Sequence, residues 1–107
     1  MMGHEKPKRE IDKDYLKWIR QQPCLVSIGR CGIGCGCEGE ITAHHDPTIG
    51  AGGSDFNALP FCLAHHIPGV HSMGKKTFQE IYNIDFNRER VRLLKNYIIL
   101  LKNKGKQ

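Results

Sequence analysis

The chain has 107 residues, 39% of them hydrophobic, which is enough for one small domain with a modest core. Sixteen lysines and arginines against eleven acidic residues give a net charge of +5, a balance that favours a polyanionic partner. No apolar run is long enough to span a membrane, and the N-terminus lacks the apolar segment of a secretory signal, so we expect a cytoplasmic protein without membrane contacts.

The N-terminal part begins with a charged segment followed by a helical pattern. We expect residues 1–10 to form a mobile basic tail and residues 11–107 to form a single domain. From Ile11 the apolar residues recur at helical spacing, and Pro23 should end this helix near Gln22. Solvent exposure explains its basic face more simply than contact with phosphate does.

Residues 24–39 contain four cysteines and five glycines, which predicts a loop or a short hairpin because glycine weakens helices. The five cysteines of the chain are an odd number and cannot all pair internally. In a reducing compartment, clustered cysteines near histidines favour metal binding over disulfides.

The central part predicts two strands and a helix. Residues 40–45 and 57–61 have the composition of strands, and residues 46–54 between them carry the proline and glycines of a loop. A helix should begin at Cys62 and be interrupted at Pro68-Gly69, because proline removes a backbone donor and glycine loosens the turn.

The C-terminal part predicts two more helices. One follows Gly74 and continues up to Asp85, and the other runs from Arg88 to about Lys102 with Asn87 as its cap. The end of the last helix is apolar nearly all round, which indicates packing on more than one face or against a second subunit.

Five of the six histidines gather near the middle of the sequence. The neighbours His44 and His45 point to opposite faces of a strand, but at a strand end both can border one cleft, one binding a metal and the other acting as a base. His66 opens the following helix and can face that strand end. His71 becomes a further ligand if the Pro68-Gly69 interruption restores its alignment; otherwise it is a surface histidine.

Cys62-x-x-His65 is a half-site of the kind that binds zinc at the base of a helix. The candidates for the other half are Cys24, Cys31, Cys35 and Cys37. Four thiols are available for about two ligand positions, so the choice is open. We assign Cys24 and Cys37, with Cys31 and Cys35 as alternatives. A buried cysteine cluster without metal is the rival interpretation.

The order of these motifs resembles the HNH (ββα-metal) endonuclease superfamily, especially small phage and prophage members similar to recombination-enhancement nucleases. The positions that carry the resemblance are His44-His45, Gly52-Gly53, Asn57, Leu59-Pro60-Phe61-Cys62, His65-His66, His71 and Gly74. The resemblance implies an α+β fold with a small ββα-metal, treble-clef-like core, a structural zinc, and flanking N- and C-terminal helices.

The resemblance also implies residue roles. His45 matches the general base that deprotonates the attacking water, and Asn57 matches the residue that ties the glycine loop to this base and fixes its tautomer. The residues that match ligands of one catalytic divalent ion (Mn, Mg, Ni, Co or Zn) are His44, His66 and His71. Asp55 lies nearby in sequence and is expected to support a histidine from outside the metal shell.

Two positions depart from the family pattern. Relatives often carry a Cys-x-x-Cys knuckle after the first helix, whereas this chain has Cys24-Leu-Val-Ser27, so a later thiol must replace the second cysteine. Four residues separate His66 from His71, where some relatives have three.

The expected activity is hydrolysis of DNA phosphodiester bonds, by nicking or double-strand cleavage, with low sequence specificity. The residues expected to contact the DNA backbone are Lys75, Lys76, Arg88 and Arg92. A homodimer, and phage packaging or recombination proteins as partners, are further expectations.

The rival interpretation is a non-catalytic module, stapled by zinc, that binds nucleic acid or protein. It explains the cysteines, His65 and the basic charge. It does not explain why histidines from the strand end and the helix start should converge outside the zinc shell.

Overall fold

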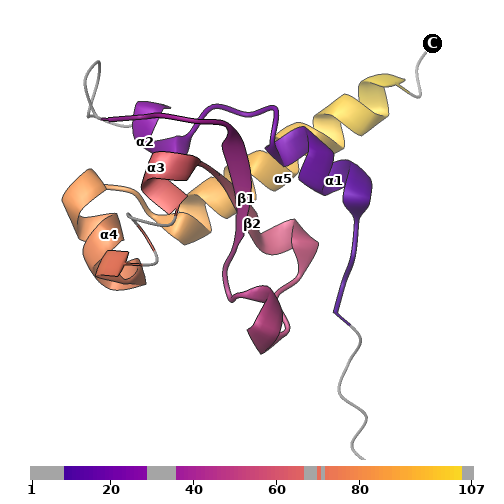
Figure 1. The fold of residues 1–107 in the computed structure, drawn as a ribbon. Coiled ribbons are helices and arrows are strands. Elements are labelled where there is room, and N and C mark those ends of the chain that lie inside the picture. Colours follow the sequence, from indigo (N-terminus) through magenta and orange to yellow (C-terminus); the bar gives the residue numbers. More distant parts are fainter. Residues whose placement is uncertain (1–8, 29–35, 67–69, 71, 105–107) are drawn as a thin grey trace, which may run out of the picture.

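The computed structural model of the chain describes residues 9–28, 36–66, 70 and 72–104. At the centre of the fold two strands, β1 (Ile41–His45) and β2 (Ala58–Cys62), pair antiparallel with helices around them (Figure 1). The molecule is therefore a small α+β domain, and both predicted strands are confirmed to within one residue.

The register of the strand pair sets the positions of the histidines. His44 lies opposite Leu59, and His45 lies opposite Ala58 at the end of the ladder. β2 is buried along its whole length, whereas β1 is only partly covered until it reaches the two histidines. The sequence thus places both imidazoles where the sheet ends and the loop begins.

The loop between the strands makes two short 3-10 turns, η1 (Ile49–Ala51) and η2 (Asp55–Asn57). Gly53 lies between them with its backbone N–H donating to Thr48 O at 2.9 Å. A Cβ atom at Gly53 would lie 1.8 Å from Pro47 O, so the loop closes only with glycine at this position.

Helix α1 (Lys13–Ile19) begins at Asp12, whose side chain accepts a hydrogen bond from Tyr15 N at 2.8 Å. It ends earlier than the sequence predicts, because the chain turns after Ile19 before it reaches Pro23.

The prediction of a loop or hairpin directly after Pro23 is wrong for its first residues, which form the short helix α2 (Leu25–Ile28). Leu25 and Val26 are buried, and the Ser27 hydroxyl donates to Cys24 O at 2.6 Å. The glycines that weaken helices occur only beyond this turn.

Three helices follow β2: α3 (Leu63–His65), α4 (Lys75–Tyr82) and α5 (Phe86–Lys104). The predicted interruption at residues 68–69 lies outside the described residues. The expectation that Asn87 caps the last helix is wrong, because the Asp85 side chain accepts from the backbone of Asn87 and Arg88 and α5 starts earlier.

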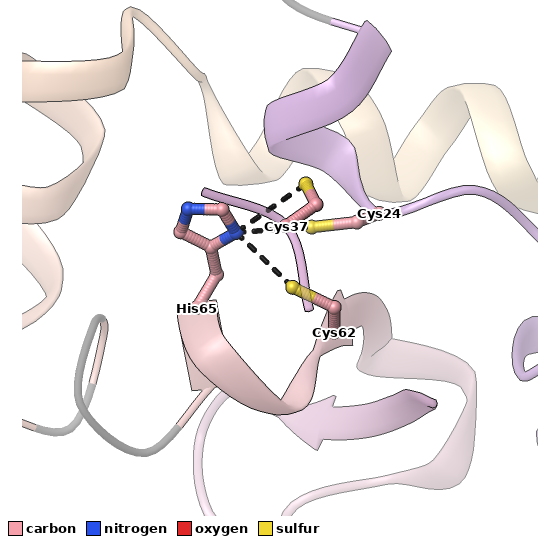
Figure 2. A group of neighbouring side chains, drawn as sticks. All are labelled: Cys24, Cys37, Cys62 and His65. Atoms are coloured by element: carbon pink, nitrogen blue, oxygen red, sulfur yellow. Dashed lines mark hydrogen bonds between the residues drawn. The ribbon is translucent and has the colours of Figure 1, made fainter. Parts of the chain in front are cut away.

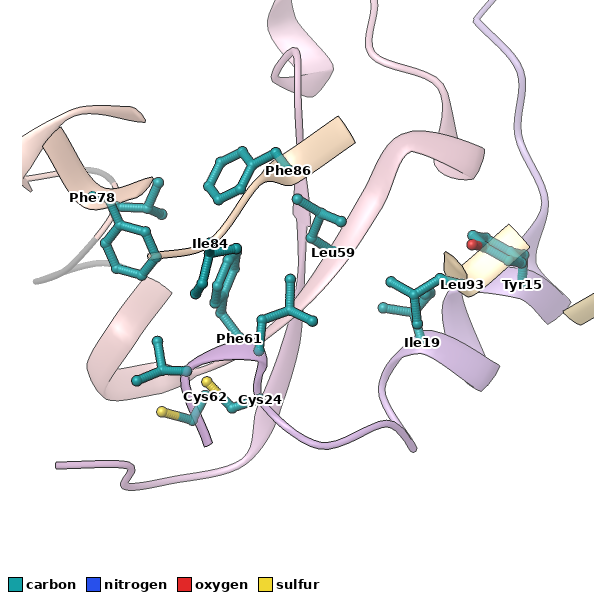
Figure 3. Packing of buried hydrophobic residues seen from close by; sticks show 13 residues of the cluster. Tyr15, Ile19, Cys24, Leu59, Phe61, Cys62, Phe78, Ile84, Phe86 and Leu93 are labelled. Carbon is teal, nitrogen blue, oxygen red and sulfur yellow. The ribbon is translucent and has the colours of Figure 1, made fainter. Parts of the chain in front are cut away.

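The core lies between β2, α1, α4 and α5, and Figure 3 shows its buried side chains. On one side the ring of Phe61 contacts those of Phe78 and Phe86, with centroid distances of 5.3 and 5.8 Å. On the other side the rings of Tyr15 and Tyr97 meet edge to face at 4.8 Å. Helix α5 passes behind the sheet and joins both parts (Figure 1). Within the described ranges, no helix is both long and apolar enough to cross a bilayer.

Replacing Gly53 with alanine should destabilise the protein by about 1–3 kcal/mol, the usual range for overpacking, because the new Cβ meets Pro47 O. Gly50→Ala is the matched control, since its Cβ has nothing within 4 Å, and its effect should stay within about 0.5 kcal/mol. Urea unfolding followed by circular dichroism measures both. Equal urea midpoints for the two variants would contradict the close approach of Gly53 to Pro47 O.

Candidate functional site

The assigned zinc residues come together in the structure. The ligand atoms of Cys24, Cys37, Cys62 and His65 all lie within 4.8 Å of one another. Figure 2 shows the three sulfurs facing the Nδ1 atom of His65. The distances to this atom are 3.7 Å from Cys24 Sγ, 3.6 Å from Cys37 Sγ and 3.2 Å from Cys62 Sγ. These four residues are thus positioned to hold a metal ion such as zinc.

Each ligand of this Cys3His cluster comes from a defined place in the fold. Cys24 lies just before α2, and Cys37 lies in the segment that leads to β1. Cys62 ends β2 and His65 ends α3, so one short turn carries two of the four ligands. Cys31, one of the two alternatives, lies with Cys35 outside the described residues.

The spacing of the cluster suits tetrahedral zinc. Zn–S bonds of about 2.3 Å and a Zn–N bond of about 2.0 Å require ligand atoms about 3.5 to 3.8 Å apart. The distances from His65 Nδ1 to Cys24 Sγ and Cys37 Sγ, 3.7 and 3.6 Å, fall in this range, and the distance to Cys62 Sγ, 3.2 Å, is somewhat shorter. Tyr82 from α4 packs its ring against that of His65 at 5.4 Å, which holds the imidazole in place.

The thiols of the cluster differ in acidity. Burial raises the pKa of Cys24, and desolvation together with the neighbouring thiols raises the pKa of Cys37 to about 12. Burial also acts on Cys62, but hydrogen bonds to its sulfur from the Glu38 and His65 backbones and from the other thiols outweigh it and lower its pKa. A metal must therefore displace protons from the first two thiols.

A second group of polar residues lies at the end of the sheet. A pocket of about 200 Å³, here called the histidine pocket, is lined by Ala43, His44, His45, Thr48, Ile49 and His66. The rings of His44 and His66 lie 5.1 Å apart and nearly perpendicular to each other. The two strand-end histidines thus border one pocket, as the sequence predicts, although they leave β1 on opposite faces.

Thr42 sets the protonation of the His66 ring. The Thr42 hydroxyl donates its hydrogen to Phe61 O at 2.7 Å, and the same oxygen lies 2.8 Å from His66 Nδ1. Because a hydroxyl has only one hydrogen, His66 Nδ1 must donate in this contact. In the neutral ring Nε2 is then the nitrogen with the lone pair, the form that can bind a metal.

Asp55 plays the corresponding part for His45. Its Oδ1 atom lies 2.8 Å from His45 Nε2, and the carboxylate is fully buried. Burial raises the pKa of Asp55, but hydrogen bonds from His45, the Asp12 backbone and Arg9 together lower it below its ordinary value. The ionised carboxylate only accepts, so His45 Nε2 donates and Nδ1 is the basic nitrogen of the neutral ring.

Asp55 rather than Asn57 makes the contact that orients the His45 ring. We predicted that the Asn57 amide would set the tautomer of His45, but the hydrogen bond to this ring comes from Asp55. The Asn57 backbone donates to Ser54 O at 3.0 Å, and its side chain has no hydrogen bond within the described part of the chain. The expected support of a histidine by Asp55 is confirmed.

The ligand set expected for a catalytic ion is present only in part among the described residues. His44 and His66 are neighbours, whereas His71 lies outside the described ranges. Among the described residues, the Cys3His cluster is the one group of three or more His, Cys, Asp or Glu side chains placed closely enough to hold a metal ion together.

The basic residues expected to bind DNA are Lys75, Lys76, Arg88 and Arg92, at the starts of α4 and α5. Lys75 Nζ lies 3.0 Å from Asp46 Oδ2, directly after His45 in sequence, so it is close to the end of β1. Arg92 pairs with Glu89 at 2.8 Å, and Lys76 and Arg88 are exposed.

Sequence reasoning missed two contributors to the site, Thr42 and Arg9. Thr42 stands two residues before His44 in a strand, a spacing that places both on one face and was a usable signal. Arg9 was expected in the mobile tail, yet its Nη1 atom lies 2.5 Å from Asp55 Oδ1. No local pattern in the sequence connects residues so far apart.

Comparison with family models, curated proteins and solved structures found no match to this chain. The resemblance to HNH endonucleases therefore depends on the motifs of the sequence and stays a prediction.

Purified protein should contain one tightly bound zinc per chain. Cys24→Ser and Cys37→Ser should each lower the zinc content sharply, because serine is a poor zinc ligand. Cys31→Ser and Cys35→Ser are matched controls that change the same side chain in the same region and should keep the metal. Elemental analysis measures this, and zinc loss in the control pair alone would overturn the assignment.

Zinc binding should weaken as the pH falls. The pKa values of Cys24 and Cys37 are raised, so both thiols are protonated at neutral pH and each must release a proton on binding. The affinity should drop by about tenfold per pH unit for each such thiol. Competition with a chromophoric chelator between about pH 6 and pH 8 tests this. A pH-independent affinity would show that the thiols are already ionised.

Proposed function

We propose that the chain is a metal-dependent endonuclease of the HNH type, which hydrolyses DNA phosphodiester bonds at the histidine pocket. The observation that carries the proposal is the meeting of His44, His45 and His66 around one pocket. His44 and His45 end β1, β2 follows, and His66 comes directly after α3, so the chain order is strand, strand and helix, as expected of a ββα-metal core. The Cys3His cluster beside α3 matches the structural zinc expected of that core.

The donor set suits a catalytic divalent ion. Imidazole nitrogens from His44 and His66 would hold it, with His71 as the further expected ligand, and such ligands favour Mn, Co, Ni or Zn over Mg. When bound, the ion would offset the negative charge that develops on the phosphate and on the leaving oxygen. Thr42 contributes by keeping the His66 ring in its metal-binding tautomer.

His45 acts as the general base in this proposal. Its Nδ1 atom takes a proton from water as the water oxygen attacks phosphorus and the bond to the leaving oxygen breaks. The imidazolium that forms is stabilised by the Asp55 carboxylate on Nε2. His45 is 8% exposed, so the water must reach it through the pocket it lines.

The substrate is held by its backbone. Lys75 next to the strand end and Arg88 at the start of α5 would contact phosphates, which gives salt-sensitive and largely sequence-tolerant binding. Low sequence specificity is expected, because contacts to the DNA backbone carry no sequence information.

The rival is a zinc-stapled module that binds nucleic acid or protein without cleaving it. The Cys3His cluster supports it, since this cluster accounts for the cysteines without any reaction.

His45→Ala separates the two proposals. It should slow nicking of supercoiled plasmid by about a hundredfold or more, because a general base contributes at least that much. Zinc content and DNA affinity should change little, because His45 is not part of the Cys3His cluster. His4→Ala, which removes the one histidine outside the central group, is the control and should cleave normally. Wild-type protein that leaves plasmid intact at low salt with Mn, Co, Ni and Mg would sink the nuclease proposal.

A further inference from the structure

The residues just before α1 lie against Asp55. Arg9 Nη1 is 2.5 Å from Asp55 Oδ1, and the Asp12 backbone N–H donates to Oδ2 at 2.8 Å. Glu10 O accepts from the backbone N–H of Asp55 at 3.0 Å. Residues 9–12, here called the N-terminal strap, thus contact both the backbone and the side chain of the residue that fixes His45.

We propose that Arg9 is a positioning residue, which acts through Asp55 to hold the His45 ring in its orientation and tautomer. Its effect on DNA cleavage rests on the proposed function, whereas its effect on the ring does not. Arg9 is not among the residues that line the histidine pocket, so it is not expected to touch the substrate.

The charge balance around Asp55 is the first argument. A fully buried carboxylate is costly unless it is paired and hydrogen-bonded, and Asp55 has no exposed surface. Arg9 and His45 share its Oδ1 atom, while the Asp12 N–H occupies Oδ2. Arg9 is the permanently charged partner among these three, so it supplies the counter-charge that keeps the carboxylate in place.

The loop between His45 and Asp55 is the second argument. Arg9 Nη1 also donates to Gly53 O at 3.3 Å, so a single guanidinium holds the carboxylate and the loop that leads to it. Gly53 itself is pressed against Pro47 O. Loss of Arg9 would release Oδ1 and the loop together, and the His45 ring would lose its fixed partner.

The strap is tested by NMR of the His45 ring in Arg9→Gln and Arg9→Lys. Lys13→Gln is the matched control, because it removes a positive charge from the same end of the chain at an exposed position. Ring ¹⁵N shifts should show mostly Nε2–H in the wild type and in the control, and a mixture of tautomers in Arg9→Gln. Arg9→Lys should be intermediate, since the ammonium keeps the charge but the shorter side chain does not reach as far as Arg9 Nη1.

Unchanged His45 shifts in Arg9→Gln would overturn the proposal, whatever the protein does to DNA. If the melting curve shows that Arg9→Gln is unfolded, the ¹⁵N shifts of the His45 ring in Arg9→Lys decide instead. Ring shifts equal to those of the wild type, together with an unchanged NMR signal of the Asp55 carboxylate, would then count against the proposal. Zinc content reports whether the rest of the fold is intact.

Cleavage kinetics then test the catalytic consequence. Arg9→Gln should lower kcat by about tenfold to a hundredfold, the effect of a misplaced catalytic group, with KM unchanged. Arg9→Lys should recover part of this loss. If the His45 ring shifts change in Arg9→Gln but kcat stays normal, the strap does not position the base for catalysis. Wild-type protein without cleavage would refute the proposed function, while the ring shifts would still decide the role of Arg9.

Discussion

The Cys3His cluster is the contact on which the arrangement of the site depends. A domain of this size has a modest core, and a metal at the cluster would join four segments that the core alone holds only partly: the α1–α2 link, the approach to β1, the end of β2 and α3. His65 faces this cluster and the next residue, His66, faces Thr42. The Cys3His cluster and the histidine pocket therefore meet at the end of one short helix, α3, so the position of His66 follows from the position of His65.

Local patterns in the sequence predicted the parts of the fold that local forces decide. The strands and the Cys62-x-x-His65 half-site follow from composition and spacing within a few residues. The choice of Cys24 and Cys37 as partners could not be derived firmly, because it depends on how distant segments pack. The same reason explains the errors: Leu25 and Val26 of the short helix α2 are buried by tertiary contacts, and Asp55 reaches His45 only through the folded loop.

The His45 and His66 rings, which both border the pocket, are held by oxygen atoms in opposite senses. His66 donates from Nδ1 to Thr42, which makes Nε2 its basic nitrogen, whereas His45 donates from Nε2 to Asp55, which makes Nδ1 basic. The first contact is with a neutral hydroxyl, and the second is with a buried carboxylate. These differences suit a metal ligand and a proton acceptor respectively, because a ligand must stay neutral while a base must become positive.

The cost of the Asp55 network is itself an argument about function. Replacing a buried, charged network with apolar side chains of similar size is often neutral or stabilising, so such a network is weak evidence for stability. Here Arg9, His45 and Asp55 occupy part of the interior of a domain with little core to spare. In a scaffold stapled by zinc, this network would serve to tie the N-terminal strap and the loop to the end of the sheet. In the proposed hydrolytic site it would have a second use, since the carboxylate fixes the proton on one ring nitrogen and leaves the other basic.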